Sequence, residues 1–253
     1  MDTLIRGGES VVPINEDLSI IQKDNGLKFG TDSYLLSAFI KKNLRGKACD
    51  LGAGCGVISL FAAARTSISE IHALEIQQDF AELISRNAAL NKLDGKITSV
   101  CADVRLVGEL YGKESFGAVF SNPPYMKRGS GKENVSSEMN TARREINGTL
   151  ADFVRAASYL LKFGGLFYVV YRPERAAELI NSLCENLLEP KRLVTVYPDA
   201  ASAPCLILIE AKKAAAPSLD VSRPLIIYGE DRKYTKDMQR VYDEFSLEHL
   251  FKK

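Results

Sequence analysis

The sequence predicts an α/β protein with a mainly parallel sheet and helices on both faces. Between Lys47 and Tyr197, short runs rich in apolar and β-branched residues alternate with segments of helical period, as in folds whose strands are joined by helices. A glycine-rich segment, Asp50 to Gly56, directly follows the first of these runs. The chain of 253 residues is 46% apolar, which is enough for one large core.

Seven runs have the length and composition of strands. They are Ala48–Leu51, Ile71–Glu75, Ile97–Cys101, Ala118–Ser121, Leu166–Val170, Leu193–Tyr197 and Leu206–Ala211. Because a short turn-rich stretch, 198–204, precedes the last run, we expect an antiparallel hairpin at the edge of the sheet. Between the second and third runs, Asp79–Asn91 carries an apolar stripe at helical spacing and predicts an amphipathic helix.

Two shorter segments flank this core. We expect residues 1–46 to form a hairpin and helix extension, residues 47–213 the ligand-binding core, and residues 214–253 a C-terminal appendage. Leu18–Phe29 predicts a hairpin that turns at residues 24–26, and Asp32–Lys42 predicts a helix after it. In the appendage, Pro224–Tyr228 resembles a strand and Lys236–Phe245 a short helix.

Composition argues against several classes of protein. With 33 Lys and Arg against 32 Asp and Glu, the net charge is only +1, so an anionic partner would have to meet a local basic patch. The five cysteines form no C-x-x-C pair and the two histidines lie far apart, which argues against a disulfide framework or a zinc site. No signal-like start and no run of about 18 apolar residues is present. We therefore expect a cytoplasmic protein with no membrane partner and no metal.

The glycine loop is the first chemical signal. Gly52, Gly54 and Gly56 lie between a predicted strand and the predicted helix Val57–Arg65, where glycines let the backbone approach a ligand and the helix start offers free N–H groups. The third glycine comes one residue too early for a dinucleotide fingerprint, which disfavours an NAD-linked oxidoreductase. Asp50 would sit poorly beside a pyrophosphate and suits a cation, such as the ammonium of S-adenosylmethionine. The alternative is a tight turn with an Asp cap.

Two acidic residues follow the next two strands. Glu75 ends the second strand, where open α/β folds place a carboxylate that binds ribose hydroxyls. Asp103 follows the third strand and could accept a hydrogen bond from an adenine amino group. Each could instead cap a helix or face solvent. Their order beside the glycine loop favours a ligand-binding function.

Asn122-Pro123-Pro124-Tyr125 stands at the end of the fourth strand. The two prolines fix the backbone, so the Asn side-chain oxygen and the carbonyl after it can be held at a fixed spacing. Two such acceptors can take both protons of an exocyclic amine and direct its lone pair at a methyl donor, while the tyrosine stacks on the target ring. An ordinary turn that ends a strand is the alternative.

These motifs together resemble the class I S-adenosylmethionine-dependent methyltransferases that act on planar amines. Four further segments make the chain similar to the bacterial valine tRNA adenine-37 N6-methyltransferase family: Gly26 to Leu36, Arg144-Glu145, Arg172 to Arg175 and Glu189 to Arg192. The resemblance implies a Rossmann-like fold whose seven-stranded sheet has a reversed last strand. It also implies that Gly30, Thr31 and Asp32 approach the methionine end of the cofactor, although the same residues suit a helix N-cap.

The resemblance implies a substrate as well, the exocyclic N6 of an adenine in the anticodon loop of a tRNA. Lys127, Arg128, Arg143 and Arg144 follow the tetrapeptide in a Gly/Ser-containing segment and could hold RNA phosphates beside Tyr125. A mixed-charge solvated loop is the alternative. A protein glutamine N5-methyltransferase acting on release factors stays open, because a carboxamide is also a planar amine. A non-catalytic cofactor-sensing or RNA-binding module stays open too.

Overall fold

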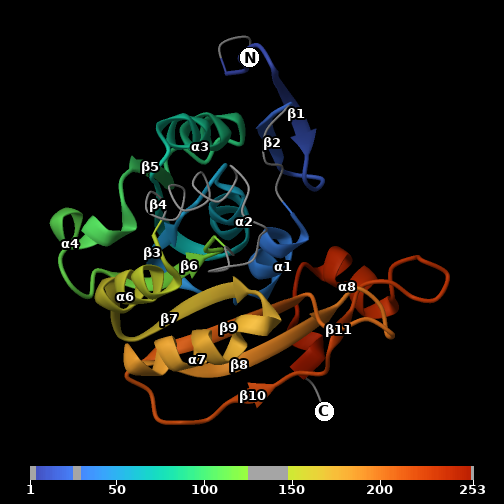
Figure 1. Cartoon of the computed structure of the whole chain (residues 1–253). Coiled ribbons are helices and arrows are strands. Elements are labelled where there is room, and N and C mark those ends of the chain that lie inside the picture. The colour runs from blue at the N-terminus through green and yellow to red at the C-terminus, as the bar shows by residue number, and fades with distance from the viewer. Residues whose placement is uncertain (1–3, 25–29, 125–147, 252–253) are drawn as a thin grey trace, which may run out of the picture.

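A computed structural model of the chain describes residues 4–24, 30–124 and 148–251 (Figure 1). The strands are β1 Glu9–Pro13, β2 Ser19–Lys23, β3 Arg45–Leu51, β4 Ser67–Glu75, β5 Ile97–Cys101, β6 Phe116–Ser121, β7 Leu161–Tyr171, β8 Leu188–Tyr197, β9 Leu206–Lys213, β10 Asp220–Val221 and β11 Leu225–Ile226. The α-helices are α1 Thr31–Phe39, α2 Val57–Arg65, α3 Gln78–Leu90, α4 Val107–Leu110, α6 Leu150–Leu160, α7 Ala176–Glu185 and α8 Lys236–Glu244. The short 3₁₀ helices are η1 Val104–Leu106, η2 Pro173–Arg175 and η3 Glu248–Phe251.

The expected α/β fold is confirmed. The main sheet runs in the order β10-β8-β9-β7-β6-β3-β4-β5, with β11 also paired to β8. β7, β6, β3, β4 and β5 pair in parallel, whereas β9 is antiparallel to both of its neighbours. The seven long strands therefore match the predicted sheet with its reversed last strand, and the two-residue strands β10 and β11 extend it to nine.

The predicted antiparallel hairpin is formed by β8 and β9. It lies toward one edge of the sheet, where, of the described strands, only the two-residue strands β10 and β11 lie beyond it, and β9 is its inner strand, between β7 and β8. The burial patterns give the reason, because β9 is buried at six successive positions while β8 alternates between buried and half-buried residues. A strand that is apolar on both faces is stable only in the interior of a sheet covered on both sides.

Helices cover both faces of the sheet (Figure 1). One buried hydrophobic cluster joins α1, α2, α3 and α8 to one face, and a second joins α4, α6 and α7 to the other. The helix predicted over Asp79–Asn91 is α3, shifted by one residue. Within the described residues, none of the helices has the length and apolar character that crossing a bilayer requires.

The N-terminal hairpin is earlier than the sequence predicted. β1 pairs with β2 from Glu9↔Lys23 to Pro13↔Ser19, so the turn lies at residues 14–18 and not at 24–26. Asn15 forms this turn, because its side-chain oxygen accepts a hydrogen bond from the backbone N–H of Leu18 at 2.7 Å. Asn side chains favour such turns. Residues 25–29, in the second half of the predicted hairpin, lie outside the described residues.

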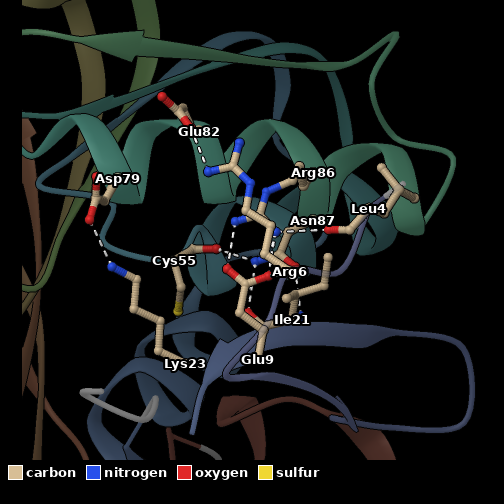
Figure 2. Close-up of polar contacts among 10 residues, drawn as sticks. All are labelled: Leu4, Arg6, Glu9, Ile21, Lys23, Cys55, Asp79, Glu82, Arg86 and Asn87. Atoms are coloured by element: carbon tan, nitrogen blue, oxygen red, sulfur yellow. Dashed lines mark hydrogen bonds and ion pairs between the residues drawn. The ribbon is translucent and has the colours of Figure 1, made fainter. Parts of the chain in front are cut away.

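Helix α3 holds this hairpin through side chains (Figure 2). Asn87 accepts a hydrogen bond from the Ile21 backbone N–H at 2.7 Å and donates one to the Cys55 carbonyl at 2.9 Å. Arg86 forms a two-bond ion pair with Glu9 and lowers the pKa of that carboxyl to about 2. Asn87 thus links β2 to the glycine loop, so the hairpin, α3 and the loop form one connected unit.

The C-terminal segment also packs on the core. The ring of Phe245 stacks on Phe61 of α2 with 4.5 Å between centroids, and its edge meets Tyr34 of α1 at 5.1 Å. Met238 and Val241 of α8 are fully buried in the same cluster. Tyr242 of α8 packs on Tyr34 at 4.9 Å, so α8 lies beside α1 (Figure 1), while Phe245, the residue after α8, contacts α2.

Candidate active site

Four strand ends bring the predicted site residues to one edge of the sheet. β6, β3, β4 and β5 are adjacent and parallel, and the register pairs Leu51 with Ser121 on one side and with Leu74 on the other. The chain leaves β3 in one direction for β4 and β5, and returns on the other side for β6. Such a switch point is where open α/β sheets bind ligands. The Ser121 hydroxyl donates a hydrogen bond to the Leu51 carbonyl at 2.8 Å and fixes this junction.

The glycine loop leaves β3 at this switch point. Gly52, Gly54 and Gly56 have φ values of +70°, +56° and +84°, a region that side chains rarely adopt. A Cβ at Gly52 would lie 3.0 Å from the Phe153 ring, and one at Gly56 would lie 3.2 Å from Ile84. A Cβ at Gly54 would meet no atom of the described residues within 4 Å. Gly52 and Gly56 therefore serve packing, while the described residues leave space beside Gly54.

Glu75 holds this loop from the neighbouring strand. Its side chain accepts a hydrogen bond from the Gly54 backbone N–H at 2.9 Å and another from the Gln77 N–H at 3.0 Å. The residue is only 6% exposed. Because each carboxylate oxygen can accept more than one hydrogen bond, Glu75 can anchor the loop and still bind the hydroxyls of a ligand.

Asp50 lies fully buried beneath the loop. The Ser59 hydroxyl donates to its Oδ2 at 2.7 Å, whereas its Oδ1 has no hydrogen-bond partner among the described residues. Burial is the main cause that raises the pKa of Asp50 to about 7; the charge of Glu75 adds to the rise, and the Ser59 hydrogen bonds oppose it. An unpartnered buried carboxylate oxygen is costly unless a cation or donor meets it. The site thus fits a cationic group of a ligand.

Asp103 follows β5 and is engaged within the chain. It caps η1 by accepting a hydrogen bond from the Arg105 backbone N–H at 2.9 Å, and both of its oxygens contact the Arg105 guanidinium. This contact lowers the pKa of Asp103. The helix-cap alternative is therefore present in the structure, and a contact with an adenine amino group stays a prediction.

Asn122 lies at the end of β6 and is oriented from α1. Its Nδ2 donates a hydrogen bond to the Ser33 hydroxyl at 3.1 Å, which fixes the rotation of the carboxamide. Pro123 is buried and Pro124 half-buried, so the backbone after Asn122 is held firmly. Ser33 was not predicted as a site residue, because only the fold brings residues 89 positions apart into contact.

The start of α1 carries the other N-terminal candidates. Gly30 is the N-cap residue, followed by Thr31 and Asp32. The Asp32 carboxylate accepts a hydrogen bond from the Ser33 backbone N–H at 2.7 Å, and a Cβ at Gly30 would lie 2.7 Å from the same oxygen. This segment therefore reaches the site through Ser33. Whether it contacts a ligand stays a prediction.

The predicted substrate-binding residues lie in the segment 125–147, outside the described residues. They are Tyr125, Lys127, Arg128, Arg143 and Arg144. Across residues 4–24, 30–124 and 148–251, no group of three metal-ligating side chains occurs. The structure describes the other predicted site residues, which are Gly30, Thr31, Asp32, Asp50, Gly52, Gly54, Gly56, Glu75, Asp103, Asn122, Pro123 and Pro124.

Comparison with known proteins agrees with this geometry. The model of the methyltransferase small domain family matches residues 24–192. A tRNA1(Val) (adenine(37)-N6)-methyltransferase from Bacteroides fragilis is 30% identical over 183 residues, which cover 72% of this chain and 76% of that protein. Another from a Flavobacteriaceae bacterium is 25% identical and covers 89% and 90% of the two chains.

Solved structures show the same fold. A predicted O-methyltransferase from Agrobacterium tumefaciens has a TM-score of 0.69 at 22% identity, covering 85% of this chain and 97% of that one. Geranyl diphosphate C-methyltransferase from Streptomyces coelicolor, in complex with S-adenosyl-L-homocysteine, has a TM-score of 0.53 at 16% identity and covers 72% and 76%.

The protein defined by this fold and site is a class I methyltransferase, and the chain belongs to the methyltransferase small domain family. Its resemblance to the valine tRNA adenine-37 N6-methyltransferases, predicted from the motifs, is confirmed by the curated relatives.

Asp50 makes the stability of the ligand-free protein depend on pH. Its pKa is about 7 in the fold against an ordinary 3.8, so the folded state holds this proton more tightly than the unfolded chain does. The stabilisation of the folded state by this bound proton is complete below about pH 4 and is lost as the pH rises through about 7. We expect this loss to be about 2 to 4 kcal/mol of the free energy of unfolding.

Urea unfolding across this pH range measures the loss as the difference in the free energy of unfolding between the wild type and Asp50→Asn. The difference curve should slope from about pH 4 to 7 and level off above. Ser59→Ala should shift the levelling-off of this curve to higher pH. The Ser59 hydrogen bond favours the ionised form of Asp50, so its loss raises the pKa of that carboxyl. A difference curve that is flat above pH 5 would contradict this assignment.

Proposed function

We propose that this methyltransferase uses S-adenosylmethionine to methylate the N6 amine of an adenine in the anticodon loop of a tRNA, at position 37 of valine tRNA. The observation that carries the proposal is Asn122-Pro123-Pro124 at the end of β6, beside the loop Gly52–Gly56 and the buried Asp50. The names of the curated relatives support the substrate. A tRNA substrate places this reaction in the cytoplasm.

Three carboxylates would hold the cofactor in this proposal. The unpartnered Oδ1 of Asp50 would take the ammonium of the methionine part, Glu75 the ribose hydroxyls, and Asp103 the adenine amino group. The open space at Gly54 leaves room for the ligand to approach the backbone. When bound, S-adenosylmethionine supplies an electrophilic methyl group on a sulfonium.

Asn122 would act on the methyl acceptor. An adenine amine is a poor nucleophile because its lone pair is delocalised into the ring. The Asn122 side-chain oxygen and the following backbone carbonyl would accept its two N–H protons and favour a pyramidal nitrogen. The Ser33 hydroxyl takes the opposite end of the carboxamide, so it keeps the oxygen turned toward the amine. Tyr125 would stack on the adenine ring, and the proton lost from nitrogen would pass to solvent.

The substrate can be tested by label transfer. The purified protein, incubated with methyl-labelled S-adenosylmethionine and total host RNA, DNA and protein, should label tRNA. Nucleoside analysis should find N6-methyladenosine next to the anticodon in the wild-type strain and none there in a strain lacking the protein. An unpaired loop base costs less to bring into the site than a base in a duplex. Label in a release-factor glutamine instead would assign the chain to protein methylation.

Variants of Asn122 and Ser33 separate chemistry from binding. Asn122→Ala should lower the turnover number about 100-fold or more, while cofactor affinity stays within about twofold, because its oxygen acts on the substrate amine. Ser33→Ala should lower turnover about tenfold without changing the KM for tRNA, and Ser33→Thr should restore it by returning the hydroxyl. Single-turnover assays and calorimetry measure the two effects. Wild-type turnover in Asn122→Ala would refute the assigned role.

A further inference from the structure

Tyrosine rings form a column on the C-terminal part of the fold. Tyr228 stacks on Tyr234 with 5.4 Å between centroids and 17° between planes. Tyr234 packs on Tyr242 at 5.1 Å, and Tyr242 packs on Tyr34 of α1 at 4.9 Å. The column therefore runs from the surface to the buried Tyr34, which follows Ser33, the partner of Asn122, in the sequence of α1.

The outer rings of this column are exposed although they are aromatic. Tyr228, Tyr234 and Tyr242 keep 42%, 44% and 41% of their surface accessible. Of the four large aromatic residues exposed in the described part of the chain, three lie in this column and the fourth is Phe163. An aromatic cluster at the surface is typical of a binding site.

The backbone holds the outer rings in place. Tyr228 and Tyr234 face each other across an antiparallel β-bridge, closed by a hydrogen bond from the Gly229 N–H to the Lys233 carbonyl at 2.8 Å. Thr235 then caps α8, because its hydroxyl accepts a hydrogen bond from the Met238 N–H at 3.1 Å. The stacked pair is thus built before any ligand arrives, which lowers the entropic cost of binding.

Positive charge surrounds the rings. Tyr228 and Tyr234 line a hollow of about 520 Å³ together with Arg232, Lys233, Lys236 and Gln239. None of the three cations forms an ion pair with another described residue. Of the five carboxylates close by in the chain, four are held by other groups: Asp231 by the Lys233 N–H, Asp237 by Arg223, Asp243 by Gln239 and Glu244 by Arg240. The fifth, Glu230, lies in the turn between the two tyrosines but does not line the hollow.

We infer that this surface, made of Tyr228, Tyr234, Arg232, Lys233 and Lys236, binds unpaired nucleotides of the substrate RNA. Single-stranded nucleic acid is held by aromatic rings on which bases stack and by cations that meet the backbone phosphates. A base stacked on Tyr228 would extend the existing column, while the three cations would take its phosphates. This inference rests on the proposed function, and it names a second place, outside the candidate active site, where the RNA is held.

RNA binding by point variants tests the inference. The probe is fluorescein-labelled valine tRNA transcript, and anisotropy gives its Kd. Tyr228→Ala should weaken binding about 5- to 100-fold, whereas Tyr228→Phe should stay within about twofold, because stacking needs the ring and not the hydroxyl. Phe163→Ala, at an exposed aromatic residue on another element, should not change the Kd. Cofactor affinity should be unchanged in all three variants, which shows that they fold.

Salt dependence tests the cations. Replacing Arg232, Lys233 and Lys236 by Gln together should reduce the slope of log Kd against log salt concentration by about 2, because each lost phosphate contact removes about 0.7 to 0.9. Lys162→Gln, beside Phe163, is the matched control and should leave the slope nearly unchanged. In methylation assays the Tyr228→Ala change should raise the KM for tRNA and leave turnover at saturating tRNA intact.

The outcomes separate the two proposals. Suppose that the wild type methylates tRNA. If Tyr228→Ala then binds tRNA as tightly as the wild type, or if Phe163→Ala weakens tRNA binding as much as Tyr228→Ala does, the inferred RNA-binding surface is wrong and the proposed function stands. If the wild type neither binds nor methylates the transcript, both are overturned. If Tyr228→Ala instead impairs methylation of a release factor, the surface docks protein and the inference is wrong.

Discussion

The structure depends on two carboxylates buried side by side at the switch point of the sheet. Burying a charge is costly unless donors or a cation compensate it. Glu75 is compensated by the backbone N–H groups of Gly54 and Gln77, and this contact sets the shape of the glycine loop. Asp50 is compensated only by Ser59 among the described residues, so its pKa rises to about 7. A cationic ligand would compensate the remaining charge of Asp50. Ligand binding would therefore also stabilise the glycine loop above it.

Contacts from three distant segments support this centre. Asn87 of α3 holds the Cys55 carbonyl of the loop and the backbone of β2. Ser33 of α1 orients Asn122, and the column that begins at Tyr34 connects α1 to α8. The N-terminal hairpin is therefore connected to this edge of the sheet through Asn87, and the C-terminal segment through α1. Under the proposed function, one side of this edge would hold the cofactor and the other would receive the RNA.

The sequence predicted most of the sheet because strand composition, glycine spacing and acidic residues at strand ends are local signals. The N-terminal hairpin was placed too late, although Asn15 carries a local turn signal. Its position is also held by distant contacts, because Asn87 of α3 and Asn91, the residue after α3, bond to the backbone of β2. The sequence predicted the β8–β9 hairpin but did not show that β9 is its inner strand, beside β7. Ser33 and Tyr228 carry no motif of their own. Their importance comes from neighbours far along the chain, which periodicity and propensity cannot locate.

The roles proposed for Asp50 and Glu75 can be tested by measuring how much each carboxylate contributes to the binding of S-adenosylmethionine. Calorimetry on the wild type, Asp50→Asn and Glu75→Gln should give measurable affinity for the wild type and a loss of about 1 to 3 kcal/mol for each variant, as for charged hydrogen bonds. Glu185→Gln, at an exposed carboxylate of α7 that accepts a hydrogen bond from Asn181, should match the wild type. Wild-type affinity in both site variants, or preferential binding of NAD by the wild type, would contradict the roles proposed for Asp50 and Glu75.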